Sequence, residues 1–185
     1  MKLKTIIIAS IVTTAIFTQS CHKGSMWGIK GQGASVSEMR NLTGFTDIDV
    51  SIDCNVSYVQ DSVYSVELNG QKDILSVLET KVKGETLVME FKRNVWNYNT
   101  LYMVIHAPAL NKMQISGSGN ISILNHISAT SLNCGINGSG NISVASVGVH
   151  SLNLTVSGSG NININGGSCT HGNYTVSGAG NLRTE

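Results

Sequence analysis

The chain has 185 residues, a formal net charge of +1, and a composition that is 41% hydrophobic but only 12% charged. The hydrophobic share is high enough to build a buried core, which argues against a disordered chain. The near-neutral charge and the lack of a long basic run argue against nucleic acid as a partner, and the length fits one domain behind a targeting segment.

Residues 1–20 have the features of a bacterial signal peptide. Lys2 and Lys4 give a basic start, and residues 6–17 form an apolar run that is too short to span a bilayer as a mature helix. We therefore predict that residues 1–20 direct export.

Cys21 follows this signal directly. Its context, Phe17-Thr18-Gln19-Ser20-Cys21, resembles a lipobox in the loose form found in lipoproteins of the Bacteroidetes. The resemblance implies that Cys21 becomes the first mature residue and carries acyl chains such as palmitate, which anchor the protein in a membrane. A secretory signal followed by an unrelated cysteine is the alternative. We expect a lipid-anchored protein of the cell envelope, in the outer membrane, with the leaflet left open.

The segment after the anchor has the composition of a tether. Residues 21–40 are rich in Gly and Ser and show little hydrophobic periodicity, which is typical of a flexible linker. We therefore expect a linker over residues 21–40 and a folded domain over residues 41–185.

The first part of that domain reads as an irregular β region. Residues 71–78 could form a short helix, with Asn69-Gly70 as its entry, and Pro108 closes the last strand before the coils begin near Leu110. Apolar alternation and β-branched residues predict four strands, over residues 45–52, 63–68, 87–91 and 101–105.

A five-residue motif recurs four times within residues 117–182. It reads Gly-Ser-Gly-Asn-Ile in three copies and Gly-Ala-Gly-Asn-Leu in the last, at steps of 21, 20 and 20 residues, with alternating apolar residues on both sides. One such unit cannot bury an apolar face alone, but stacked units can. We therefore predict an all-β fold, a right-handed parallel β-helix or β-solenoid with coils of about 20 residues.

The repeated residues are expected to be structural. Glycine suits tight corners because it adopts positive φ without a Cβ clash, and stacked asparagines about 4.8 Å apart can hydrogen-bond along the stack. The glycine positions are Gly117, Gly119, Gly138, Gly140, Gly158, Gly160, Gly178 and Gly180. The asparagine positions are Asn120, Asn141, Asn161 and Asn181.

Several segments together resemble the head GIN domain family. They are Gly44-Phe45-Thr46-Asp47-Ile48-Asp49-Val50, Tyr64-Ser65-Val66-Glu67, Gly84-Glu85-Thr86-Leu87, the run from Met103 to Leu110, and the repeats. The resemblance covers about residues 41 to 185. It implies a β-helical domain of secreted or lipid-anchored envelope proteins, with an inferred role as the head of an adhesin. It brings no catalytic residues, and it does not identify a ligand.

Few residues carry chemistry that points to an enzyme. Asp47, Asp49 and Asp53 lie an even number of residues apart and would share one strand face, with Asp61 nearby, but these acids are expected outside the coils. Paired acids serve glycoside hydrolysis, so a polysaccharide-active enzyme is a low-probability alternative. Outward polar residues on an edge strand explain the acids as well, and we predict no catalytic residue and no cofactor.

His150 and His171 are 21 residues apart and could stack on adjacent coils, with Cys169 two positions from the second histidine. This set lacks the further ligands of a typical metal site, so no metal site is predicted.

Three cysteines follow Cys21, namely Cys54, Cys134 and Cys169. Cys134 occupies the repeat position of Leu154, which predicts a small buried apolar side chain. One disulfide among the three would be compatible with an oxidising compartment, and the sequence does not choose its partners.

The function expected first is a non-enzymatic binding or adhesive module, which presents a rigid surface to a glycan or protein. A structural periplasmic lipoprotein that binds another envelope component is the second reading. Unpaired backbone at the open end of the coils near Leu182 also suggests self-association, although Arg183 and Glu185 could blunt that edge.

Overall fold

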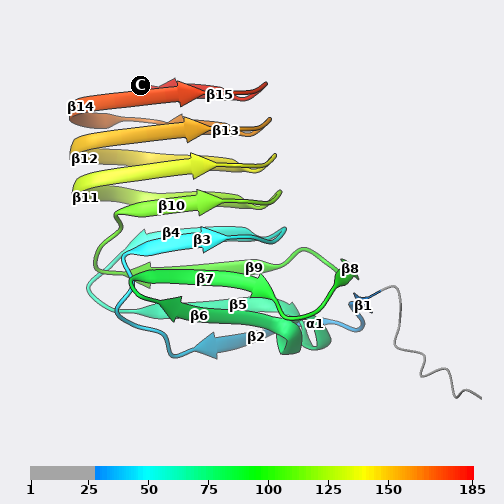
Figure 1. Cartoon of the computed structure of the whole chain (residues 1–185). Coiled ribbons are helices and arrows are strands. Elements are labelled where there is room, and N and C mark those ends of the chain that lie inside the picture. Colours follow the sequence, from blue (N-terminus) through cyan, green and yellow to red (C-terminus); the bar gives the residue numbers. More distant parts are fainter. Residues whose placement is uncertain (1–27) are drawn as a thin grey trace, which may run out of the picture.

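The computed structural model describes residues 28–185. The predicted signal peptide (1–20), the lipidation site Cys21 and linker residues 21–27 lie outside this range. The described chain is β-structure apart from one short helix (Figure 1), so the all-β prediction is confirmed. None of its helices is long and apolar enough to cross a membrane.

The first part of the described chain holds nine strands and the helix. They are β1 (Ile29–Lys30), β2 (Ser35–Arg40), β3 (Asp47–Val50), β4 (Asn55–Gln60), β5 (Ser65–Gln71), α1 (Lys72–Val77), β6 (Leu78–Lys83), β7 (Thr86–Phe91), β8 (Val95–Asn97) and β9 (Tyr102–Ala107). The repeats supply β10 (Lys112–Ile115), β11 (Asn120–Ile136), β12 (Asn141–Val156), β13 (Asn161–Ile164), β14 (Gly167–Val176) and β15 (Asn181–Thr184).

The repeats lie one above another as parallel strands. β11 pairs with β12 from Asn120↔Asn141 to Ile136↔Val156, with one irregularity after Ile123. β12 then pairs with β13 and β14, and β13 pairs with β15, again in parallel. Figure 1 shows this arrangement as successive levels that rise toward the C-terminus. We call β3, β4 and β10–β15 together the coil stack.

The stack begins earlier than the sequence suggested. β10 pairs in parallel with β3, and β11 pairs in parallel with β4, so the first coil runs from Asp47 rather than from Leu110. The turn of this coil, residues 51–54, has no glycine, which hides it from a search for the repeat. Residues 61–109 form a long excursion before the chain returns to the second coil.

The excursion builds a base of mixed pairing. β9 pairs in parallel with β4 and antiparallel with β5, while β7 pairs in parallel with β3 and antiparallel with β6. The predicted helix is confirmed as α1, which buries Ile74, Leu75 and Val77 and has Asp73 in its first turn. The four predicted strands are confirmed as β3, β5, β7 and β9, whereas β4, β6 and β8 were not predicted.

The described residues of the expected linker, 28–40, contain two strands that pair with strands of the folded domain. Residues Ser35–Arg40 form β2, which pairs antiparallel with β5, and β1 pairs with β8. The Gln71 side chain secures this segment by donating to the Gly33 carbonyl at 3.2 Å. Because most side chains of β2 are exposed, the strand lacks the apolar alternation by which sequence patterns reveal strands.

One hydrophobic cluster fills the interior from the base to the upper coils. In each coil, buried Ile, Val or Leu alternates with half-exposed Asn or Ser, as expected for strands with one buried face. The column formed by Ile121, Ile142 and Ile162 is at most 1% exposed. The polar residues between them are thereby held at the surface.

Candidate functional site

The four asparagines of the repeats lie on one another as a hydrogen-bonded ladder. The side-chain amide of Asn141 donates to Oδ1 of Asn120 at 2.9 Å, Asn161 donates to Asn141 at 2.8 Å, and Asn181 donates to Asn161 at 2.9 Å. Asn120 in turn donates to Oδ1 of Asn55 at 2.9 Å. Asn55, in the glycine-free first coil, was not predicted as a member.

A second ladder was also missed. Asn173 donates to Oδ1 of Asn153 at 2.9 Å, Asn153 donates to Asn133 at 2.8 Å, and Asn133 donates to the Asn111 carbonyl at 3.1 Å. The sequence contained a sign of this ladder, since Asn133, Asn153 and Asn173 recur at steps of 20 residues. Both ladders engage the side-chain amides along the stack, so their role is to hold the coils in register.

The turn glycines are required by close stacking of the turns. A Cβ on Gly140 would lie 1.9 Å from the Gly119 carbonyl oxygen, and one on Gly160 would lie 2.0 Å from that of Gly140. Of the eight turn glycines only Gly178 has a positive φ, of 155°. The expected reason, a positive φ at each corner, is therefore wrong for the other seven.

The acidic residues do not form one line. Asp47 and Asp49 alternate on β3 with buried Ile48 and Val50 and so point outward. They belong to the first coil, whereas they were expected outside the coils. Asp53 lies beyond the strand, exposed in the following turn.

Asp61 is paired with a histidine of the base. Its Oδ2 lies 3.1 Å from Nδ1 of His106 on β9. The hydrogen bond with His106, followed by one from the Ser62 backbone, holds the pKa of Asp61 below its ordinary value. This pair ties the loop after β4 to β9.

The rings of His150 and His171 lie in contact on adjacent coils, with centroids 4.9 Å apart and planes tilted by 60°, although the strand register places His171 opposite Ser151. Cys169 does not join them, since its Sγ lies 3.8 Å from the hydroxyl oxygen of Tyr174. Within residues 28–185 there is no group of three or more His, Cys, Asp or Glu side chains that could hold a metal ion.

The three described cysteines are free thiols. Cys134 lies opposite Leu154 in the adjacent coil, and burial raises its pKa to about 12. Burial, aided by the negative charge of Asp53, raises the pKa of Cys54 to about 12 as well. Both thiols stay protonated at neutral pH and behave as small apolar side chains.

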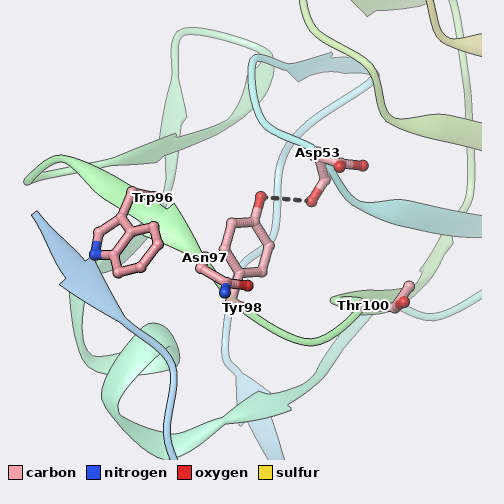
Figure 2. A pocket seen from close by; sticks show the side chains of 5 residues that line it. All are labelled: Asp53, Trp96, Asn97, Tyr98 and Thr100. Atoms are coloured by element: carbon pink, nitrogen blue, oxygen red, sulfur yellow. Dashed lines mark hydrogen bonds between the residues drawn. The ribbon is translucent and has the colours of Figure 1, made fainter.

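A pocket that the sequence did not reveal lies at the side of the first coil, and it has a volume of about 280 Å³. Its lining residues come from the turn after β3, from β8, and from the segment between β8 and β9. They are Asp53, Trp96, Asn97, Tyr98 and Thr100 (Figure 2).

Tyr98 fixes the shape of this pocket. Its hydroxyl donates to the backbone carbonyl of Asp53 at 2.9 Å, and its ring packs edge-on against Phe91 at 5.4 Å between centroids. Burial and the charge of Asp53 raise the pKa of Tyr98 to about 12, so the hydroxyl remains a donor. Since Tyr98 uses the backbone of Asp53, the exposed carboxylate is not engaged by Tyr98 (Figure 2).

Trp96 is the exposed wall of the pocket. Its side chain is 56% exposed, and Lys30 Nζ lies 5.7 Å from its ring centroid in a cation–π contact. Aromatic residues are only 5% of the sequence. Trp96 and Tyr98 are therefore unusual in the polar segment that follows β7, and they could have been used to predict a binding site there.

The described fold defines a class of all-β proteins in which strands of successive repeats pair in parallel and asparagine ladders line the surface. Residues 44–185 match the family model described as "Putative auto-transporter adhesin, head GIN domain". The chain belongs to the head GIN domain family, as its sequence motifs indicated.

Solved structures share the fold. A "putative adhesin" from Parabacteroides distasonis has 18% identity and a TM-score of 0.68, with 84% of this chain and 75% of that chain covered. A "putative lipid binding protein" from the same species has 13% identity and a TM-score of 0.64, with coverage of 85% and 99%. A "putative adhesin" from Bacteroides fragilis has 16% identity and a TM-score of 0.55, with coverage of 85% and 100%. No curated protein matches the sequence.

Proposed function

We propose that the chain is a non-enzymatic envelope protein whose head domain binds a glycan or protein outside the cell. The observation that carries this proposal is the stack with its polar surface and the pocket that contains the exposed Trp96. Such a scaffold presents preformed contacts, so binding orders few side chains. Membership of an adhesin head family and two relatives described as adhesins support the same reading.

The proposal includes a finer description of the fold, a right-handed parallel β-solenoid. Parallel registers at steps of 20 or 21 residues and a continuous column of buried aliphatic residues support it. The right hand follows the general preference of parallel crossover connections.

We also propose that the protein is a lipoprotein of the outer membrane, anchored through acyl chains on Cys21. Support comes from the apolar export signal and from the position of Cys21 directly after it. Residues between Cys21 and β1 would then be the tether that raises the head from the membrane.

A periplasmic structural role is the second candidate. The sequence His22-Lys23-Gly24 after the anchor lacks the acidic residues that direct some Bacteroidetes lipoproteins to the surface. In this case the head would bind another envelope component, and loss of the protein would weaken the envelope. A polysaccharide-active enzyme ranks third, and turnover that disappears with Asp49→Asn would revive it.

Adherence tests the first candidate. Cells that express the full chain are compared with cells that express Cys21→Ala and with cells that lack the chain, on surfaces coated with mucin glycoprotein. We expect several-fold more adherent cells for the full chain alone, because only the anchored head stays on the cell. Equal adherence of all three strains would contradict an adhesive role, and detergent sensitivity of the deletion strain would favour the structural one.

We further propose that the uppermost coil pairs with a second copy of the chain. Within the described residues β14 pairs only with β12 and β15 only with β13, and Tyr174 and Val176 are 49% and 45% exposed. Open strand edges are templates for another chain. Sedimentation should show dimers that Val176→Lys abolishes, whereas a monomer at every concentration would refute the pairing.

A further inference from the structure

The Trp96 pocket is held in place before any ligand arrives. Two backbone hydrogen bonds fasten β8 to β1, from Ile29 N to the Asn94 carbonyl at 2.8 Å and from Gly31 N to the Asn97 carbonyl at 2.7 Å. Tyr98 fastens the other side through its bond to Asp53. A site that is fixed in this way loses little conformational entropy when it binds a ligand.

The groups that line the pocket combine a flat apolar surface with a polar rim. The Trp96 indole is largely exposed, and the exposed side chains of Asp53, Asn97 and Thr100 supply a carboxylate, an amide and a hydroxyl to the same pocket. Figure 2 shows Asp53 and Thr100 on the other side of the Tyr98 ring from Trp96. A pyranose ring has the matching pattern, with an apolar C–H face and hydroxyl groups at its edge. Aromatic side chains are suited to such a ligand because they offer area at low entropic cost.

The charge of the pocket narrows the ligand class. Asp53 is the one charged residue among the five that line it, and the positively charged Nζ of Lys30 lies 5.7 Å from the Trp96 ring centroid, so the two charges at the site balance. A site without net charge suits a neutral sugar, whose hydroxyls can donate to the Asp53 carboxylate, better than a sialic acid, a uronic acid or a sulfated sugar.

The pocket also lies at the foot of a polar column. Asp53 stands one coil below Ser118, because Asn55 pairs with Asn120 in the same register, and Ser139 and Ser159 follow on the coils above. These three serines are exposed. A sugar chain that starts in the pocket can therefore continue along hydroxyl groups spaced by about 4.8 Å, the distance between neighbouring strands.

We infer that the pocket between Asp53 and Trp96 is a binding site for a neutral oligosaccharide, with Trp96 as the stacking platform. The inference rests on the proposed binding function and names its ligand class and its site. A pocket of about 280 Å³ is at the small end for ligand sites, so a single site binds weakly. Many anchored copies on one cell would raise the avidity.

Titration of Trp96 fluorescence tests the inference on the full mature chain with Trp27→Phe, which leaves Trp96 as the one tryptophan. The probes are neutral gluco-, galacto- and manno-oligosaccharides of one to six units, with sialylated and sulfated counterparts. We expect saturable binding of at least one neutral series, tighter for longer chains. No neutral binding, or binding of the anionic probes alone, would overturn the inference.

Variants locate the site by calorimetry with the neutral probe that binds. Trp96→Ala should weaken binding at least tenfold and Asp53→Asn several-fold, while Trp96→Phe should retain part of the affinity. Leu124→Ala is the matched control, since Leu124 is 57% exposed but lies in another coil, and it should change nothing. Equal affinity of Trp96→Ala and the parent would overturn the inference.

The adhesive role and the sugar site at Trp96 can be disproved independently of each other. If cells that carry Trp96→Ala adhere like the parent while purified parent protein binds no sugar, the pocket inference falls and the adhesive role stands. If purified protein binds sugar through Trp96 but expressing cells do not adhere, the adhesive role falls and the sugar site stands.

Discussion

Buried thiols make the stability of this protein sensitive to alkaline pH. Cys134 is fully enclosed between coils, and burial raises its pKa from 9.0 to about 12. The folded state keeps the thiol protonated, whereas the unfolded state releases the proton once the pH exceeds about 9. The stabilisation is therefore complete below pH 9 and is lost between about 9 and 12, at about 1.4 kcal/mol for each pH unit.

Cys134→Val should make this dependence less steep, because valine has no proton to release and fills a similar volume, while Cys54, whose pKa is also about 12, keeps its own contribution. Urea unfolding at several values between pH 8 and pH 11 measures it, with the parent protein titrated in parallel. Parallel decline of the two proteins would show that Cys134 is not the titrating group.

The asparagine ladder also contributes to the stability of the folded state. Asn141 donates to Asn120, and it accepts from both the side chain and the backbone N–H of Asn161. Asn141→Ala leaves these half-buried groups without partners, so we expect a loss of about 1–3 kcal/mol in the free energy of unfolding. The exposed Asn181 makes a single ladder bond, and Asn181→Ala should cost clearly less. Similar losses for both variants in chemical denaturation would argue against the ladder.

The turns set the spacing of the elements. Gly140→Ala places a Cβ 1.9 Å from the Gly119 carbonyl oxygen and must push two coils apart, whereas a Cβ on Gly166 would meet nothing closer than 4.0 Å. We expect Gly140→Ala to lower the free energy of unfolding by more than about 2 kcal/mol, and Gly166→Ala to change it by less than about 1 kcal/mol. Thermal unfolding of both variants checks this, and an equal change would contradict the stacking.

The elements that could be predicted are those whose sequence pattern matches their burial. Regular alternation around each Gly-Ser-Gly-Asn turn predicted the strands of the repeats, and apolar runs predicted β3, β5, β7 and β9. The first turn, with Ile52 and Cys54 where later turns have glycine, concealed the start of the stack. β2 was not predicted, because a strand whose side chains are mostly exposed has no alternation of apolar and polar residues.

The candidate site was harder to predict because distant segments create it. Asp53 and Trp96 are far apart in sequence, and they meet only because residues 61–109 leave the first coil and return beside its turn. The repeats, which dominate the sequence, supply the scaffold and the serine column instead. The candidate site therefore lies where residues 61–109 interrupt the repeated coils.

In the proposed lipoprotein Cys21 anchors the head domain, and the orientation of the head at the envelope decides its role. An outward head can reach glycans on other surfaces, whereas an inward head can bind only periplasmic components. The pocket and the serine column work in adhesion only if the head faces outward.

Protease shaving of intact cells that express the full chain tests this orientation most directly, with Cys21→Ala expressed alongside. We expect the head to be cleaved from intact cells, and the Cys21→Ala chain to be recovered in the soluble fraction. A head that resists cleavage until the outer membrane is opened would contradict surface display and make a periplasmic role the better explanation.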